Sequence, residues 1–319
     1  MIFDSESVFE DNVITVLKQH GWKDGVLRYP TEQDLLDNWK GILYRNNNDI
    51  DRLGKYPLTD GEMAQIIEQI ETLRTPLALN SFVNGRTVSI TRDNKEDVAH
   101  FGKEISLYIY DRKEIAGGKS TYQIAQQPVY PAKNKMLNSR RGDLVLLING
   151  MPLIHIELKK SGIPVSQATN QIEKYTHEGV FTGLFRLVQI FVAMNPDDAV
   201  YFANPGVDKF NPSYYFHWAD YNNEPICGGQ NPGKDEWKLF IGGTSGTAGL
   251  LSIPMAHQSS ASTPSPTRQT DASRCCAATS TSLRTPSLTW CANAIGNSGQ
   301  LLRDDQAAMY GTLPVPEKP

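Results

Sequence analysis

The chain contains little cysteine and no long apolar run, and both absences exclude whole classes of protein. Only four cysteines occur among 319 residues, without any Cys-x-x-Cys pair, so neither a zinc site nor a disulfide framework is indicated. No apolar stretch is long enough to span a membrane, and the start, Met-Ile-Phe-Asp-Ser-Glu, is unlike a signal peptide. We therefore expect a cytoplasmic protein with no membrane partner.

A net basic charge is also absent. The chain has 31 Lys and Arg against 35 Asp and Glu, a formal net charge of −4, so any nucleic-acid footprint must be local. One local run contains Lys133, Lys135, Arg140 and Arg141, directly before Asp143. Such a run would bind DNA phosphates without reading their sequence, or it would be a solvated loop.

The pattern of apolar residues indicates one α/β domain. With 39% hydrophobic residues, a core of about 200–250 residues is easily built. Strands are expected at residues 87–91, 105–110, 122–130, 187–194 and 200–203. One helix should begin at a capping box of Ser7 and Glu10, and another should cover residues 60–73 and stop before Pro76. These elements predict a mixed central sheet flanked by helices.

Two branched apolar runs, residues 144–148 and 151–160, are separated by Asn149-Gly150 and predict a β-hairpin. Side chains alternate along a strand with period two. His155, Glu157 and Lys159 should therefore share one face of the second strand.

The position of Asp143 depends on the turn. A two-residue loop would pair Asp143 with Ile156 and place it on the face opposite Glu157. A three-residue loop at 148–150, with its glycine in the left-handed region, would pair Asp143 with His155, beside Glu157. We predict the second register, because only that register brings the two carboxylates together.

Two carboxylates and a lysine are what a Mg²⁺-dependent nuclease requires. The oxygens of Asp143 and Glu157 are hard ligands suited to Mg²⁺, which lowers the pKa of a bound water and neutralises phosphate charge. Lys159 can hold the attacking water or the phosphate. The alternative is an ordinary hairpin that carries these side chains as solvated charges.

The segment after the hairpin, residues 166–177, lacks Gly and Pro and reads as a helix capped by Ser166. Gln167, Gln171 and Tyr175 repeat every four residues and so lie on one face. This face could contact the same phosphate backbone, or it could be a half-buried polar surface.

Together these residues resemble a known family. Asp143, Glu157-x-Lys159 and Gln171-x-x-x-Tyr175 are similar to the PD-(D/E)XK nuclease domain at the N-terminus of type I restriction enzyme R subunits. The resemblance covers about the first 258 residues and implies a restriction-endonuclease-like fold. It further implies that Asp143 and Glu157 bind Mg²⁺, that Lys159 is catalytic, and that Gln171 and Tyr175 assist cleavage or DNA contact.

The resemblance bears on two further positions, Glu10 and Gly142. In the nuclease fold an acidic residue of the first helix approaches the metal, which makes Glu10 a candidate ligand, one turn from Glu6; a solvated charge is the alternative. Gly142 stands where the motif's name has Pro.

The resemblance implies an endonuclease that hydrolyses phosphodiester bonds in double-stranded DNA, with modification and specificity subunits as partners. ATP belongs only to the full-length relative, because this chain has no P-loop. The alternatives are an idle remnant that only binds DNA or those subunits, and a stand-alone nuclease with a natural tail.

Aromatic residues cluster in a loop-rich stretch, which we interpret as a packed connection and not as a base-stacking platform. They are Tyr214, Tyr215, Phe216, Trp218 and Tyr221.

The C-terminal part differs in composition. We expect a nuclease domain at 1–225, a linker toward a missing motor at 226–258 and a disordered tail at 259–319, since about half of residues 259–289 are Ser or Thr. Codons compatible with residues 311–319, read two nucleotides later, encode His-Thr-Thr-Gly-Ser-Gly-Lys-Thr, which ends as a P-loop does. We expect a frameshift just after Gln258; a genuine disordered tail is the alternative.

Overall fold

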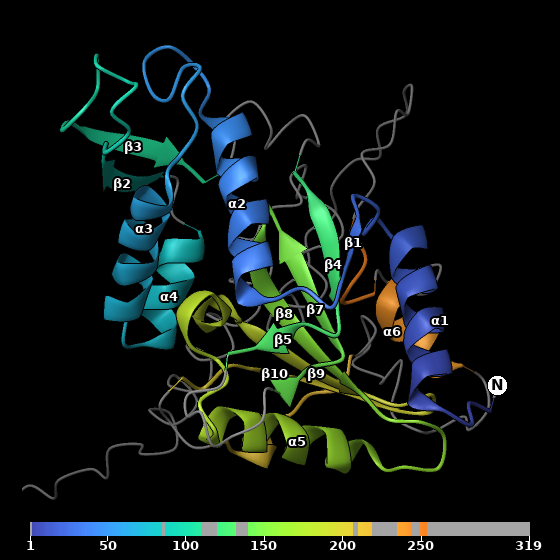
Figure 1. The fold of residues 1–319 in the computed structure, drawn as a ribbon. Helices are drawn as coiled ribbons and strands as arrows, with labels where there is room; N and C mark the ends of the chain where they lie inside the picture. The colour runs from blue at the N-terminus through green and yellow to red at the C-terminus, as the bar shows by residue number, and fades with distance from the viewer. Residues whose placement is uncertain are drawn as a thin grey trace, which may run out of the picture.

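A six-stranded mixed sheet lies at the centre of the structure (Figure 1), a computed structural model. The structure describes residues 2–84, 87–109, 120–131, 140–206, 210–218, 235–243 and 249–253. The strands of this sheet follow the order β1-β4-β7-β8-β9-β10. Their bounds are Val26–Arg28 for β1, Tyr122–Gln126 for β4, Leu144–Ile148 for β7, Met151–Leu158 for β8, Ile190–Met194 for β9 and Ala199–Ala203 for β10.

Both parallel and antiparallel pairs occur in this sheet. β1 runs parallel to β4, and β8 runs parallel to β9, whereas the other neighbours are antiparallel. Two small sheets pair β2 (Thr87–Thr91) with β3 (Glu104–Tyr108) and β5 (Val129–Tyr130) with β6 (Arg140–Arg141). The mixed α/β fold expected from the sequence is confirmed.

Helices surround the sheet (Figure 1). They are α1 (Glu6–Gln19), α2 (Glu32–Asn46), α3 (Asp60–Thr72), α4 (Pro76–Val83), α5 (Val165–His177) and α6 (Glu236–Gly242), with short 3-10 turns η1 (Gly183–Leu187) and η2 (Pro212–Tyr214). α5 packs on β8 and β9, and α1 contacts both β8 and α6. No helix in the described part of the chain is long and apolar enough to cross a membrane.

Helix ends differ from the expected caps in two places. The cap of α1 is Ser5, whose side chain accepts a hydrogen bond from Val8 N, and not Ser7. α5 begins after Pro164 without a side-chain cap, so the prediction of Ser166 as its cap is wrong. α3 ends at Thr72, and Pro76 occupies the first turn of α4, where its missing N–H leaves no hydrogen bond unmade.

Three expected strands are shorter than the sequence suggested. Residues 122–130 form two strands, because Gln127 adopts a left-handed φ of 49° between them. Residues 187–189 precede β9, which begins at Ile190, and β3 ends at Tyr108. Position 110 lies outside the described residues.

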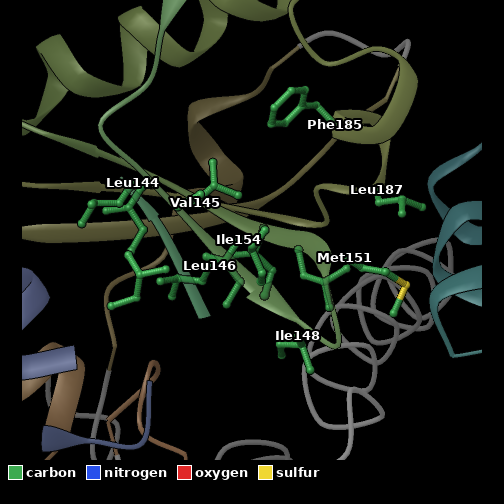
Figure 2. Packing of buried hydrophobic residues seen from close by; sticks show 14 of the residues in the cluster. Leu144, Val145, Leu146, Ile148, Met151, Ile154, Phe185 and Leu187 are labelled. Carbon is green, nitrogen blue, oxygen red and sulfur yellow. The ribbon is translucent and has the colours of Figure 1, made fainter. Parts of the chain in front are cut away.

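Alternate side chains of β8 have different neighbours. Ile154, Ile156 and Leu158 belong to the main buried cluster, which also contains residues of β7 and of η1 (Figure 2). A second cluster lies between α5 and strands β9 and β10, and includes Phe191 and Ala193. His155 and Glu157 pair with these two residues, so they lie on the α5 side of the sheet.

The turn between β7 and β8 corrects the predicted loop length. Ile148 pairs with Met151, so the loop has two residues, Asn149 and Gly150, with φ of 50° and 84°. Positive φ at both residues is the type I′ geometry that Asn-Gly favours. A Cβ on Gly150 would lie 2.8 Å from the Trp39 Cα, so α2 packs directly against the turn.

Several expectations concern residues outside the described ranges: Lys133 and Lys135, Tyr221, and the tail at 259–319. The segment expected to link to a motor, 226–258, is described at 235–243 and 249–253. There α6 packs against α1, and Trp237, Phe240 and Ile241 join the main buried cluster.

Candidate active site

A β-bulge brings Asp143 and Glu157 together. The register shifts between Leu146 and Leu147, so that Val145 pairs with His155 and Leu144 with Ile156. The shift adds one residue to β8 and moves the partner of Asp143 one residue forward, toward Glu157, whereas the predicted longer loop would have moved it one residue back, to His155. The predicted pairing of Asp143 with His155 is therefore wrong, but the shared face is present.

Direct contacts establish this arrangement. Asp143 Oδ2 accepts a hydrogen bond of 2.7 Å from Leu158 N, the backbone group next to Glu157. The two carboxyl groups are close enough to interact, since the charge of Glu157 raises the pKa of Asp143.

Both acids are removed from solvent, Glu157 completely and Asp143 in part. Glu157 is 0% exposed, and neither of its carboxylate oxygens has a hydrogen-bond partner. Burial raises the pKa of Glu157 to about 8, and burial followed by the Glu157 charge raises the pKa of Asp143 well above its usual range. Charged carboxylates are costly in such a place unless a cation joins them.

Lys159 supplies one positive charge beside this pair. Its Nζ lies 3.7 Å from Glu157 Oε1 and donates a hydrogen bond of 2.9 Å to the Leu158 carbonyl. It also lies 3.6 Å from Glu6 Oε1 of α1. The sequence reading noted Glu6 only as a neighbour of Glu10, and nothing in the spacing indicated its contact with the lysine.

Glu10, the candidate ligand from the first helix, faces the sheet, and its oxygens already have partners. They accept hydrogen bonds from Gln126 Nε2 at 2.7 Å and from Gln127 Nε2 at 3.1 Å. Burial raises the pKa of Glu10, whose charge in turn raises the pKa of Asp143. Within the described residues, no three His, Cys, Asp or Glu side chains converge into a ready-made metal centre.

His155 is part of the site although the sequence assigned it no role. Its Nε2 lies 3.3 Å from Glu157 Oε2, and its Nδ1 forms a hydrogen bond of 2.8 Å with the Tyr130 hydroxyl. Burial lowers the pKa of His155 to about 4, so the ring is neutral at pH 7. The period-two pattern put His155 on the Glu157 face, but no local signal pointed to Tyr130.

Gln171 and Tyr175 lie together on α5, as predicted. Gln171 Nε2 donates to the Tyr175 hydroxyl at 2.7 Å, and that hydroxyl donates to the Arg141 carbonyl at 2.8 Å. Tyr175 therefore connects α5 to the strand that leads into Asp143. Beside it lies an open depression of about 380 Å³ lined by Arg140, Gln167, Asn170, Gln171, Lys174 and Tyr175.

The basic and aromatic residues singled out in the sequence have different surroundings. Arg140 is held by Glu178 through hydrogen bonds of 2.7 and 2.8 Å, whereas Arg141 is exposed. Tyr215 stacks on Phe202 at 4.1 Å and donates to Glu173 at 2.6 Å, which agrees with a packed connection.

Comparison with known proteins shows which proteins this chain resembles in sequence. Residues 4–210 match the family model described as type I restriction enzyme R protein N terminus. The endonuclease subunit of type I restriction enzyme SsaAORF53P from Staphylococcus saprophyticus is 31% identical over 232 residues, which are 71% of this chain and 22% of that protein. The SauCOLORF180P endonuclease subunit from Staphylococcus aureus (strain COL) is 32% identical over 228 residues, with the same shares.

A shorter relative also matches. The EcoprrI endonuclease subunit from Escherichia coli is 28% identical over 254 residues, 71% of this chain and 76% of that protein. The chain spans about a fifth of the length of the two staphylococcal subunits, since the matched part is 22% of each.

Proposed function

This chain belongs to the family of type I restriction enzyme R protein N-termini, and we propose that it is the Mg²⁺-dependent nuclease domain of a restriction endonuclease subunit. The relatives are named as endonuclease subunits, which supports a restriction nuclease role. The reaction proposed is hydrolysis of phosphodiester bonds in double-stranded DNA. The proposed partners are the modification and specificity subunits, and ATP is assigned only to full-length relatives.

One observation carries the proposal: the buried Glu157 and the half-buried Asp143 lie together, and both oxygens of Glu157 lack a hydrogen-bond partner. These oxygens are hard donors that fit Mg²⁺, which proteins often bind through one or two carboxylates together with substrate phosphates. Two protein carboxylates therefore suffice, although no group of three acids or histidines is present among the described residues.

The side chains have separate roles in this proposal. Asp143 and Glu157 would hold the metal, which supplies a water of lowered pKa and offsets the charge of the phosphate. Glu10 adds negative charge beside them while its oxygens bind Gln126 and Gln127. Lys159, 3.7 Å from Glu157, would hold the attacking water or a phosphate oxygen by charge and hydrogen bonding.

α5 supports the strand that carries Asp143. Because Tyr175 donates to the Arg141 carbonyl, its hydroxyl fixes the backbone two residues before Asp143. Gln171 completes that contact, and the depression beside it exposes Lys174 and Arg140 to an approaching phosphate backbone.

The experiment is cleavage of plasmid DNA by the full chain with Mg²⁺ and with EDTA. Glu157→Ala should abolish Mg²⁺-dependent cleavage, whereas the matched exposed substitution Glu68→Ala should leave it unchanged. Cleavage by Glu157→Ala at the wild-type rate would refute the nuclease assignment. A wild-type chain that binds the DNA without cutting it would favour the idle remnant.

A further inference from the structure

A buried row of three polar side chains ends at the proposed metal ligand. The Tyr130 hydroxyl and His155 Nδ1 are 2.8 Å apart, and His155 Nε2 is 3.3 Å from Glu157 Oε2. Tyr130 is 1% exposed, and the other two are 0% exposed. The row lies wholly inside the protein, behind the carboxylate, where it cannot touch DNA.

We propose that His155 is a positioning residue that orients the Glu157 carboxylate, and that Tyr130 fixes the imidazole in the tautomer this requires. The inference rests on the proposed nuclease function, because it assigns Glu157 as a metal ligand. It adds two residues that the sequence motif does not contain.

The tautomer follows from the partners of the ring. The Tyr130 hydroxyl can donate to Nδ1 or accept from it, so this contact alone does not set the tautomer. Nε2 is the nitrogen that faces Glu157, and a charged carboxylate can only accept, so metal binding that keeps Glu157 charged places the ring proton on Nε2 and makes Nδ1 the acceptor of the Tyr130 O–H. While Glu157 is charged, the opposite tautomer would direct a lone pair at the carboxylate oxygen and repel it.

The contact between ring and carboxylate is close but not yet aligned as a hydrogen bond, since Nε2 and both Glu157 oxygens lack partners. Catalytic hydrogen bonds are often long or poorly aligned before a ligand binds. A modest rotation of the carboxylate would complete this one, and partners of this kind are conserved features of metal-binding carboxylates.

The ring itself has little freedom to move. Its centroid lies 5.3 Å from Phe181, 6.0 Å from Phe191 and 6.3 Å from Tyr175. An imidazole placed there only for packing would bury two polar nitrogens at a cost that an apolar side chain avoids. The retained polar ring is better explained by its contact with Glu157.

Gly142 provides independent support. A Cβ at this position would lie 2.5 Å from the Tyr130 hydroxyl oxygen and 2.8 Å from His155 Cε1. The tyrosine and the histidine therefore occupy the space that a side chain at position 142 would need. This explains why glycine, and not proline, precedes Asp143 in this chain.

The first test is the tautomer, measured by ¹⁵N NMR of the full chain labelled at histidine and saturated with Mg²⁺, which keeps Glu157 charged, with the His155 signals identified by their loss in His155→Gln. We expect the proton on Nε2 in the wild type and a mixture of tautomers in Tyr130→Phe. A wild-type ring protonated on Nδ1 would overturn the proposal.

The second test is Mn²⁺ affinity by calorimetry. His155→Leu, which removes the donor, should weaken binding by about 10–100-fold, and His155→Gln, which keeps an N–H near the same place, should restore most of it. Equal affinity in the wild type and His155→Leu would overturn the proposal. If His155→Leu fails to fold, Tyr130→Phe decides: weaker binding supports the proposal and unchanged binding overturns it.

The same Mn²⁺ titration distinguishes failure of the positioning role from failure of the proposed nuclease function. Loss of Mn²⁺ binding in Glu157→Ala, with no change in the His155 variants, removes only the positioning role. Absence of binding in the wild type removes the proposed nuclease function and this inference with it.

Discussion

At the scale of single residues, the most informative side chain is Glu157, a carboxylic acid with no exposed surface and no hydrogen bond. Its environment favours the neutral acid in the absence of a cation, and the charged form in its presence. The same residue therefore links stability, pH and metal binding. Substitutions at Glu157 and at the glycine beside Asp143 test this link.

The stability of the metal-free chain should fall as pH rises. Burial raises the folded-state pKa of Glu157 from 4.5 to about 8. An acid whose pKa is higher in the folded state contributes its full stabilisation below the unfolded-state pKa. This contribution is lost as the pH rises to the folded-state pKa. The melting temperature should decline between about pH 5 and pH 8 and then level off, and Glu157→Gln should reduce the decline.

Differential scanning fluorimetry in EDTA measures this directly. Glu68→Gln, an exposed change, is the control and should follow the wild type. Saturating Mg²⁺ should also flatten the dependence of melting temperature on pH, because it stabilises the charged form of Glu157. Parallel curves for the wild type and Glu157→Gln would show that this carboxyl does not titrate in the folded protein as described.

Gly142→Ala should destabilise the protein. The added Cβ would lie 2.5 Å from the Tyr130 hydroxyl oxygen, and Tyr130 is 1% exposed and cannot move aside. Overpacking of this kind typically costs about 1–3 kcal/mol, measurable by urea unfolding. Gly41→Ala is the control, since no atom lies within 4 Å of its Cβ and alanine favours a helix. Equal stability of Gly142→Ala and the wild type would contradict the described packing.

The sequence predicted which residues lie together better than it predicted the strand register that brings them together. Period-two alternation placed His155, Glu157 and Lys159 on one face, and the structure agrees. Tyr130 and Glu6 were not anticipated, because each reaches the site from an element distant in sequence. The chemical roles of all these residues stay predictions.

At the scale of elements, the β7–β8 hairpin shows why register is hard to derive. The Asn149-Gly150 turn followed its local preference for a two-residue loop, and the extra residue was placed within β8 instead. Every residue of β8 is buried, so no alternation of polar and apolar residues revealed the bulge. β1, three residues long, and α4, which begins with proline, were missed for lack of any comparable pattern.

The junction of α5 with β6 can be tested by Tyr175→Phe. The lost hydroxyl leaves the Gln171 amide and the Arg141 carbonyl without the partner they share. These groups are part-buried, so their loss of a partner should cost less than the about 1–3 kcal/mol of a fully buried polar group. Urea unfolding should show this loss, and cleavage should slow because the backbone before Asp143 is held less firmly. Tyr214→Phe, at a residue 49% exposed, is the control and should change neither quantity.

A Tyr175→Phe variant as stable as the wild type but slower in cleavage would place the hydroxyl's main role with the substrate. Unchanged stability together with unchanged cleavage would contradict the structural role proposed for α5.

At the scale of the whole molecule, the nuclease core includes chain beyond the region matched by the family model, which ends at residue 210. Ile253 N donates to the His20 carbonyl, and Trp22 Nε1 donates to the Leu251 carbonyl at 2.7 Å. Residues near 250 are thus fixed to the loop after α1, the helix that carries Glu6 and Glu10. The C-terminal segment consequently holds the end of α1 in place.

Trp237→Ala should therefore destabilise the protein although it lies far from the site in sequence. Trp237 is 0% exposed and packs edge-on against Phe9 at 5.3 Å and near Phe3 at 6.1 Å. Removing a buried tryptophan costs about 3–5 kcal/mol, and the cavity would lie beneath α1. Because α1 carries Glu6, which contacts Lys159, cleavage should fall together with the unfolding midpoint. Tyr214→Ala, an exposed aromatic truncation, is the control. A Trp237→Ala chain with unchanged stability would show that α6 is not part of the folded core.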